Sequence, residues 1–167
     1  MLSPDINSVE KISQQLIQVS GRAGRNNNLA KVIIQTRYPN DENLKKIKTG
    51  DYQIVAEKCL KTNKALDIPP YSNISILRAI SPNPQIGIKF LDKAHKILKN
   101  KKNVDVIGPF PSIPFKVKGN TRNHLVIKSN TKTYLNRVLK FLTKEIENWP
   151  ETNKVKWSYD IDPYDMS

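Results

Sequence analysis

Apolar residues recur every three or four positions in several stretches of this chain, the spacing that places them on one face of a helix. The first stretch covers residues 8 to 20, and its apolar positions are Val9, Ile12, Leu16 and Val19. We expect Ser8 to cap this helix, which begins at Val9, and we expect the helix to stop at Gly21. Two shorter helical patterns follow, at about 41 to 48 and 51 to 65.

Strands are predicted where β-branched residues cluster. The run Lys31-Val-Ile-Ile-Gln-Thr36 predicts a short buried strand before the second helix. A strand from about 73 to 80 has Ile74, Ile76 and Ile80 on one face, because side chains alternate along a strand. Further strands are expected at about 103 to 107, 125 to 127 and 155 to 161.

The part of the chain after residue 65 is expected to alternate strands with two helices. Pro69 and Pro70 favour extended backbone at its start. Pro84 begins one helix behind Asn83, and Asn130 or Thr131 caps another that runs to about residue 148. The proline-rich stretch 108 to 114 is expected to be a rigid loop. The resulting order β-α-β-β-α-β is typical of a ferredoxin-like fold, one antiparallel sheet with both helices on one face.

Length and charge narrow the possible functions. The chain has 167 residues, which suits one domain or a small domain with an appendage but not two RecA-like lobes of about 150 residues each. Its 28 Lys and Arg residues outnumber 15 Asp and Glu residues, which favours an acidic partner such as nucleic acid. The sequence is also rich in Lys, Asn and Ile, and an A+T-rich coding sequence would explain part of that charge.

Other features exclude whole classes of site. Cys59 is the single cysteine, so an internal disulfide and a cysteine-rich zinc site are excluded, and a buried apolar thiol is expected. His95 and His124 have no partner at metal-ligand spacing. The N-terminal residues lack the apolar core of a signal peptide, and no run reaches the length of a membrane span, so a cytoplasmic protein is expected.

The strongest chemical motif lies at the end of the first helix. The stretch Gln18-Val-Ser-Gly21-Arg22-Ala-Gly24-Arg25 has the pattern Q-x-x-G-R-x-G-R. Glycines let the backbone approach a nucleotide closely, and two guanidinium groups can reach its phosphates. The alternative interpretation is a polar loop that carries two arginines without a ligand.

This motif resembles motif VI of superfamily 2 helicases, and four further stretches look like the C-terminal landmarks of the PriA replication-restart helicases, also called primosomal protein N′. Those stretches are Leu66-Asp-Ile-Pro-Pro-Tyr71, Ile76-Leu-Arg-Ala79, Val106-Ile-Gly-Pro109 and Lys154-Val-Lys-Trp-Ser-Tyr-Asp-Ile-Asp-Pro163. The order and spacing agree with that family over almost the whole chain.

The resemblance implies an α/β segment followed by an α+β domain. Residues 1 to 65 would be the end of the second RecA-like lobe, with an exposed sheet edge and apolar surface, and residues 66 to 167 the C-terminal domain. It implies that Arg22 and Arg25 act on the γ-phosphate of ATP, with Gln18, Gly21 and Gly24 lining the nucleotide site. ATP and Mg²⁺ are expected only if other parts supply the phosphate loop, which this sequence lacks, and no zinc is expected.

The resemblance also implies partners: DNA at stalled forks, the acidic tail of single-stranded DNA-binding protein and other primosome proteins, without a membrane. The family's basic residue and the Gln four positions later fall on Lys132 and Asn136, near a helix N-terminus that suits a carboxylate. Arg122 remains from a basic-aromatic stretch, whereas Asn120 and Asn123 replace the usual Arg and Trp. Lys132 can equally be a solvated helix residue.

Two other groups have plainer interpretations. The lysines on the helix from Pro84 and at its exit are expected to form its solvated face rather than a DNA-binding stripe; they are Lys89, Lys93, Lys96, Lys99, Lys101 and Lys102. Asp160 and Asp162 are expected to make loop or lobe-interface contacts. Three hypotheses remain open: a part of a PriA-type helicase, a stand-alone binding module, and a non-functional remnant.

Overall fold

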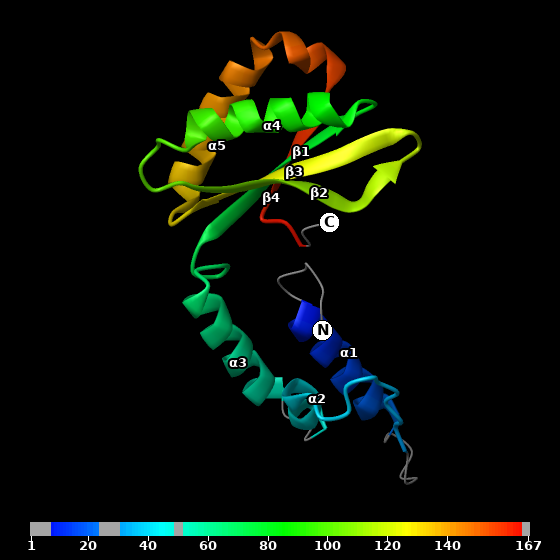
Figure 1. Cartoon of the computed structure of the whole chain (residues 1–167). Helices are drawn as coiled ribbons and strands as arrows, with labels where there is room; N and C mark the ends of the chain where they lie inside the picture. Colours follow the sequence, from blue (N-terminus) through cyan, green and yellow to red (C-terminus); the bar gives the residue numbers. More distant parts are fainter. Residues whose placement is uncertain (1–7, 24–30, 49–51, 165–167) are drawn as a thin grey trace. The chain divides into compact units, whose positions relative to one another are not determined.

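The computed structural model describes residues 8–23, 31–48 and 52–164, and the chain divides after Leu66 into two compact units (Figure 1). In the described residues of the first unit there are three helices: α1 (Ser8–Ala23), α2 (Glu42–Ile47) and α3 (Tyr52–Ala65). They pack against one another, with a polar contact between α1 and α3 in which the Tyr52 hydroxyl donates to Glu10 at 2.9 Å and accepts from Gln14 at 2.9 Å.

Two predictions for the first unit are wrong. Lys31 to Thr36 form no strand, and Ile33 is 81% exposed, because a strand needs a hydrogen-bonded neighbour and the described residues of this unit contain none. Helix α1 does not stop at Gly21 but continues to Ala23. Gly21 lies in open space and is tolerated within a helix at a cost of about 1 kcal/mol relative to Ala.

The second unit is a four-stranded sheet with two long helices. Its elements are β1 (Asn73–Ser81), α4 (Pro84–Leu98), β2 (Asp105–Val117), β3 (Asn120–Ser129), α5 (Lys132–Glu147), a short 3-10 helix η1 (Pro150–Lys154) and β4 (Lys156–Ile161). The strand order is β2-β3-β1-β4, and every neighbouring pair is antiparallel. The fold class is therefore α+β in this unit.

Helices α4 and α5 cover one face of the sheet (Figure 1). Leu77 and Ala79 of β1 and Leu125 of β3 point toward them, since these positions alternate with residues of the opposite face. Phe90 lies fully buried in this core, with its ring 5.2 Å from that of Trp149 in an edge-to-face contact. The core thus joins both helices, both central strands and the segment that leads into β4.

The helix starts follow from capping side chains. Asn83 accepts a hydrogen bond from the Gln85 amide at 2.9 Å, and Pro84 occupies the first helical position. At α5 the cap is Thr131 and not Asn130, with the Thr131 hydroxyl accepting from the Tyr134 amide at 3.3 Å. Both helices therefore begin where the sequence predicts.

Strand β2 differs most from its prediction. The stretch 108 to 114 is not a loop between strands but part of β2, which continues to Val117. Its pairing with β3 shifts register twice, between Ile107 and Phe110 and between Pro111 and Lys116. A hairpin then connects β2 to β3 through Lys118 and Gly119, both with positive φ, as a two-residue hairpin turn requires.

Candidate nucleic-acid and partner interface

The described part of the helicase-like motif lies at the exposed end of α1. Gln18, Gly21 and Arg22 are all exposed, and nothing lies within 4 Å of the position that a Cβ at Gly21 would occupy. Gly24 and Arg25 lie outside the described residues. The structure therefore presents three of the five motif positions on a helix surface that a ligand could approach closely, instead of on the glycine turn that the sequence suggested.

Lys132 and Asn136 lie one turn apart at the start of α5, on the same side of the helix. The amide groups of this first helical turn point away from the helix and favour anions. Lys132 adds a cation at the same end. The predicted carboxylate-binding features are thus together in one place.

A carboxylate of the chain itself already lies beside Lys132. The Asp162 side chain, which follows β4, accepts from the Lys132 ammonium at 2.7 Å. Asp162 has a positive φ of 54°, and its amide donates to the Ile74 carbonyl at 3.0 Å, which fixes the backbone there. Both side chains of the pair are exposed, so the contact is weak and exchangeable. Asp162 follows the end of β4, so its ion pair with Lys132 is a loop contact, one of the two alternatives that the sequence suggested.

Arg122 does not belong to this site. It lies on β3 opposite Ile80, seven positions before Ser129, the last residue of the strand, a distance of about 23 Å at the usual rise per residue. It lies two positions from His124 on the same face of β3, and the pKa of that imidazole is lowered by burial and by the charges of Arg78 and Arg122. The structure thus separates the predicted binding residues into two groups.

His124 is the centre of the second group. The side chain is buried, and its Nδ1 lies 3.1 Å from the Ser112 hydroxyl of β2. Burial is the main cause of the lowered pKa, so the neutral imidazole is favoured. The ring of Phe110 lies 5.9 Å from the imidazole, centroid to centroid. This group joins β2 to β3 across the irregular part of their pairing.

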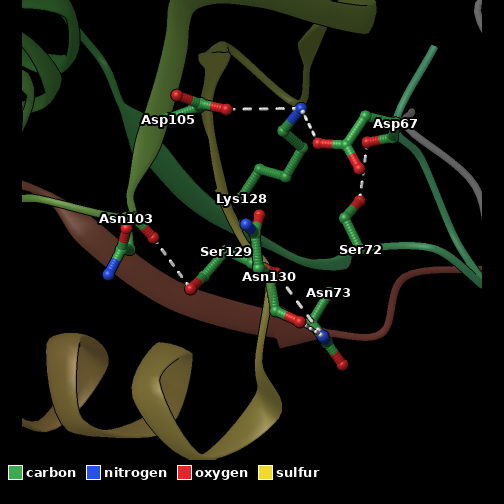
Figure 2. A network of polar contacts seen from close by, with 8 residues as sticks. All are labelled: Asp67, Ser72, Asn73, Asn103, Asp105, Lys128, Ser129 and Asn130. Atoms are coloured by element: carbon green, nitrogen blue, oxygen red, sulfur yellow. Dashed lines mark hydrogen bonds and ion pairs between the residues drawn. The ribbon is translucent and has the colours of Figure 1, made fainter. Parts of the chain in front are cut away.

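A polar network holds the entry segment of the unit to the sheet, and Figure 2 shows it. The Lys128 ammonium lies 2.9 Å from the Asp67 carboxylate and 3.3 Å from that of Asp105. The hydrogen bond to Asp67 is the main cause of a raised Lys128 pKa. Ser129 donates to the Asn103 carbonyl at 2.9 Å, and Asn73 donates to the carbonyls of Ser129 and Asn130. The segment that leads to the cap of α5 is therefore fixed on both sides.

An ion pair between two strands was missed by the sequence analysis. Arg78 of β1 donates to Asp160 of β4 at 2.9 Å. Asp160 lies in β4, within the strand predicted at 155 to 161, and pairs with Ile76, two residues from Ser158, the partner of Arg78. Its contact is this cross-strand ion pair, where a loop or lobe-interface contact was expected. The strand itself was predicted, but its pairing with β1, which brings Asp160 to Arg78, was not part of that prediction.

The lysines of α4 and its exit divide into two kinds. Lys93 lies over the Trp149 ring at 4.6 Å and 3.4 Å from the Glu151 carboxylate, and Lys101 lies over the Phe141 ring at 3.8 Å. These two pack their stems and charges on aromatic rings. The other four are exposed; they are Lys89, Lys96, Lys99 and Lys102. This is the arrangement of a solvated helix face that also covers part of the core.

Cys59 is half-buried on α3, and burial raises the pKa of its thiol. Across residues 8–23, 31–48 and 52–164, no three or more His, Cys, Asp or Glu side chains are grouped so that they could hold a metal ion. Within the same ranges, none of the helices has the length and apolar character that a membrane crossing requires.

Comparison with known proteins places this domain. Residues 64–164 match the family model described as the primosomal protein N C-terminal domain. The chain belongs to this family. The match begins close to the division between the two units and covers all of the second unit that the structure describes.

Relatives in this family align beyond the domain itself. Three of them, each named replication restart protein PriA, come from Haemophilus influenzae (26% identical, 100% of this chain, 23% of the relative), Bacillus subtilis (31%, 98% and 20%) and Thermotoga maritima (33%, 87% and 19%). The chain therefore spans about a fifth to a quarter of the length of these primosomal relatives.

Proposed function

We propose that this chain acts in replication restart, as the C-terminal portion of a PriA-type DNA helicase. The supporting observation is that proteins named replication restart protein PriA align with 87 to 100% of this chain, the helical unit included. In this proposal its partners are DNA at stalled forks, the tail of single-stranded DNA-binding protein and other primosome proteins.

Residues 1 to 65 are, in this proposal, the end of a second RecA-like lobe, and residues 66 to 167 are a ferredoxin-like domain. The order β2-β3-β1-β4 with both helices on one face supports the second assignment. Exposed apolar side chains in the first unit, Val19 and Ile33 among them, support the first, since the rest of a lobe would cover such residues.

Arg22 and Arg25 would then act on ATP held by another lobe. An exposed Arg22 beside open space at Gly21 fits a group that a nucleotide approaches from outside. An arginine of this kind stabilises charge on a transferred phosphoryl group only where a phosphate loop and Mg²⁺ already hold the triphosphate. The purified chain is therefore expected to hydrolyse no ATP above background. Steady turnover that disappears in Arg25→Ala would contradict this.

DNA binding is the activity that the second unit should retain alone. Between residues 67 and 164 there are 17 Lys and Arg residues against eight Asp and Glu residues. Binding of a fluorescently labelled fork DNA, followed by anisotropy, is expected to weaken steeply and log-linearly with salt and to be unaffected by ATP. No binding at low salt, or binding that is insensitive to salt, would contradict the proposal.

The start of α5 is proposed to bind the carboxylate end of an acidic tail. An acidic peptide with a free C-terminal carboxylate should bind more tightly than its amidated form, as measured by calorimetry. Because Asp162 competes for Lys132, Asp162→Asn should tighten binding by about 0.2–1 kcal/mol, the range for an exposed ion pair. Lys132→Glu should weaken it, whereas Lys144→Glu at the other end of α5 is the matched control. Equal effects of both charge reversals would remove the site from α5.

Two other functions are distinguished by the same measurements. A stand-alone binding module would be favoured by two findings together. The chain would bind DNA in a salt-dependent way, and its genome would encode no separate protein with the phosphate loop and DExH segment. A folded chain that binds neither DNA nor the peptide would be a non-functional remnant. The Lys, Asn and Ile bias would agree with this, as would Lys132 and Asn136, which replace the family's basic residue and Gln.

A further inference from the structure

Strand β2 contains an enlarged bulge at its second register shift. The pairs on either side are Pro111 with Asn123 and Lys116 with Thr121. Four residues of β2, from 112 to 115, therefore stand where β3 has only Arg122. Bulges of this kind redirect side chains and are common next to functional sites.

The bulge begins with a buried residue, and the apolar residues that follow are exposed. Ser112 is only 2% exposed, and its contact with His124 holds the backbone against β3. Ile113 and Phe115, the next apolar residues, are 62% and 42% exposed, and Phe110 just before the bulge is 44% exposed. Three large apolar side chains thus lie at the sheet edge, on a segment that is itself fixed.

The hairpin and the residues after it contain charges of one sign. From Val106 to Lys144 the sequence contains no Asp or Glu, while eight Lys and Arg residues fall in the same range. Lys116 and Lys118 are exposed on the hairpin, and Arg122 faces the bulge. Exposed aromatic rings beside cations, without an acidic residue nearby in the chain, complement a partner that has both flat rings and phosphates.

The backbone of β2 is a poor binding site for a peptide strand. An added peptide strand would need N–H groups along the edge of β2, but Pro109, Pro111 and Pro114 have none. Duplex DNA shows its phosphates but keeps its base faces stacked inside, so exposed phenyl rings would gain little from it. Single-stranded nucleic acid offers both base faces and phosphates.

We propose that the outer side of the β2–β3 hairpin, residues 110 to 122, is a contact site for single-stranded nucleic acid. Phe115 and Phe110 stack on bases, while Lys116, Lys118 and Arg122 contact phosphates. This proposal deepens the DNA binding proposed above and rests on it. It also assigns Arg122 to this hairpin, apart from the start of α5.

The test compares Phe115→Ala with Phe141→Ala in the full chain. Phe141, on α5, has a similar exposure of 37% and so is a matched aromatic control. Affinity for a labelled oligothymidine of about 16 nucleotides is expected to fall about tenfold in Phe115→Ala and to change little in Phe141→Ala. Affinity for a duplex of equal length should fall much less. Phe115→Trp should retain binding, and its added fluorescence should be quenched by the single strand.

Charge is tested with two double reversals of equal size. Lys116→Glu with Lys118→Glu should weaken binding of the single strand and flatten its salt dependence more than Lys140→Glu with Lys144→Glu on α5. The four lysines are exposed, so their reversal should leave the fold intact. Thermal unfolding of each variant checks this.

The outcomes separate this inference from the proposed function. If the chain binds DNA but Phe115→Ala and Phe141→Ala behave alike, the hairpin site is wrong and DNA binding stands. If the chain binds no DNA at any salt concentration, both fail. If Phe115→Ala weakens an acidic peptide and leaves the oligothymidine unchanged, the hairpin is a peptide site and the proposal is overturned.

Discussion

The two units of this chain differ in how many of their apolar side chains are buried. Among the described residues, 21 hydrophobic side chains are buried, and all but Ile47 and Val55 lie in the second unit. The first unit instead exposes apolar side chains on its helices and on the segment 31 to 36, including Val19, Ile33 and Leu60. Similar local patterns therefore have different outcomes in the two units.

The difference shows what a strand pattern requires. In the second unit β1 lies between β3 and β4, so its backbone groups are paired and both of its faces are covered. In the first unit the run Lys31–Thr36 has equally β-prone residues but no neighbouring strand among the described residues. A β-branched run becomes a strand only where hydrogen-bonding partners exist.

Hydrogen exchange should show the largest contrast between the units. Amides of β1 and β3 exchange only through global opening, which for an ordinary domain costs about 5–15 kcal/mol, whereas the short helices of the first unit need only local opening. We expect amides after residue 66 to be protected by several orders of magnitude more than those before it. Equal protection in both units, measured by mass spectrometry, would mean that they fold as one cooperative body.

Removing a core side chain from each unit should sharpen this contrast. Leu142→Ala deletes a fully buried side chain of the second unit and should cost about 3–5 kcal/mol, since a cavity remains. Both tryptophans lie in the second unit, so their fluorescence in urea reports its unfolding. Val55→Ala, in the first unit, should leave that transition in place. A shift of similar size in both variants would show that the two units are coupled.

High pH should destabilise the second unit through Tyr159. Burial raises the pKa of this phenol to about 12, above its usual 10, so the unfolded chain loses the proton first. This contribution to the stability is therefore fully present below about pH 10, and about 3 kcal/mol is lost as the pH rises from about 10 to about 12. Lys128, whose pKa is also raised, acts in the same direction.

Tyr159→Phe should remove most of this alkaline loss in urea titrations between pH 9 and pH 12. The matched change Tyr164→Phe, at a side chain 72% exposed, should leave the loss unchanged. An unaltered alkaline loss in Tyr159→Phe would mean that other groups control it.

Mild acid should have the smallest effect, through His124. Burial and the nearby arginines lower its pKa below the usual 6.5, so the unfolded chain takes up a proton before the folded chain does. The stability of the second unit should therefore decrease as the pH falls below about 6.5. His124→Gln, which can still bond Ser112, should flatten this decrease. Identical pH profiles of the two proteins would exclude His124 as the cause.

Periodicity predicted the helices well because their apolar stripes and caps are local. Asn83, Pro84 and Thr131 act within a few residues of themselves, so the sequence contains the whole cause. Strand β2 was mispredicted because its prolines favour a loop locally, whereas pairing with β3 holds them in the sheet. In β1 the isoleucines share one face as predicted, but only the structure shows that the opposite face, with Leu77 and Ala79, lies under the helices.

The candidate site was only partly accessible from sequence. Lys132 and Asn136 are one helical turn apart, so their proximity follows from spacing alone. Arg122 was grouped with them by family resemblance, but the length of β3 separates it from them. The pairs Lys132–Asp162 and Arg78–Asp160 join residues 30 and 82 positions apart, and only the sheet topology brings them together.

If the start of α5 binds anions as proposed, its ion pair would discriminate among them by valence. Asp162 is tethered beside Lys132, so its effective concentration there is in the millimolar range or above, and a free monocarboxylate would have to exceed that to displace it. A ligand with several adjacent carboxylates would have a higher local concentration of carboxylate beside Lys132, whereas acetate would not. The internal carboxylate would thus keep common metabolites off this surface while leaving it open to a polyanionic segment.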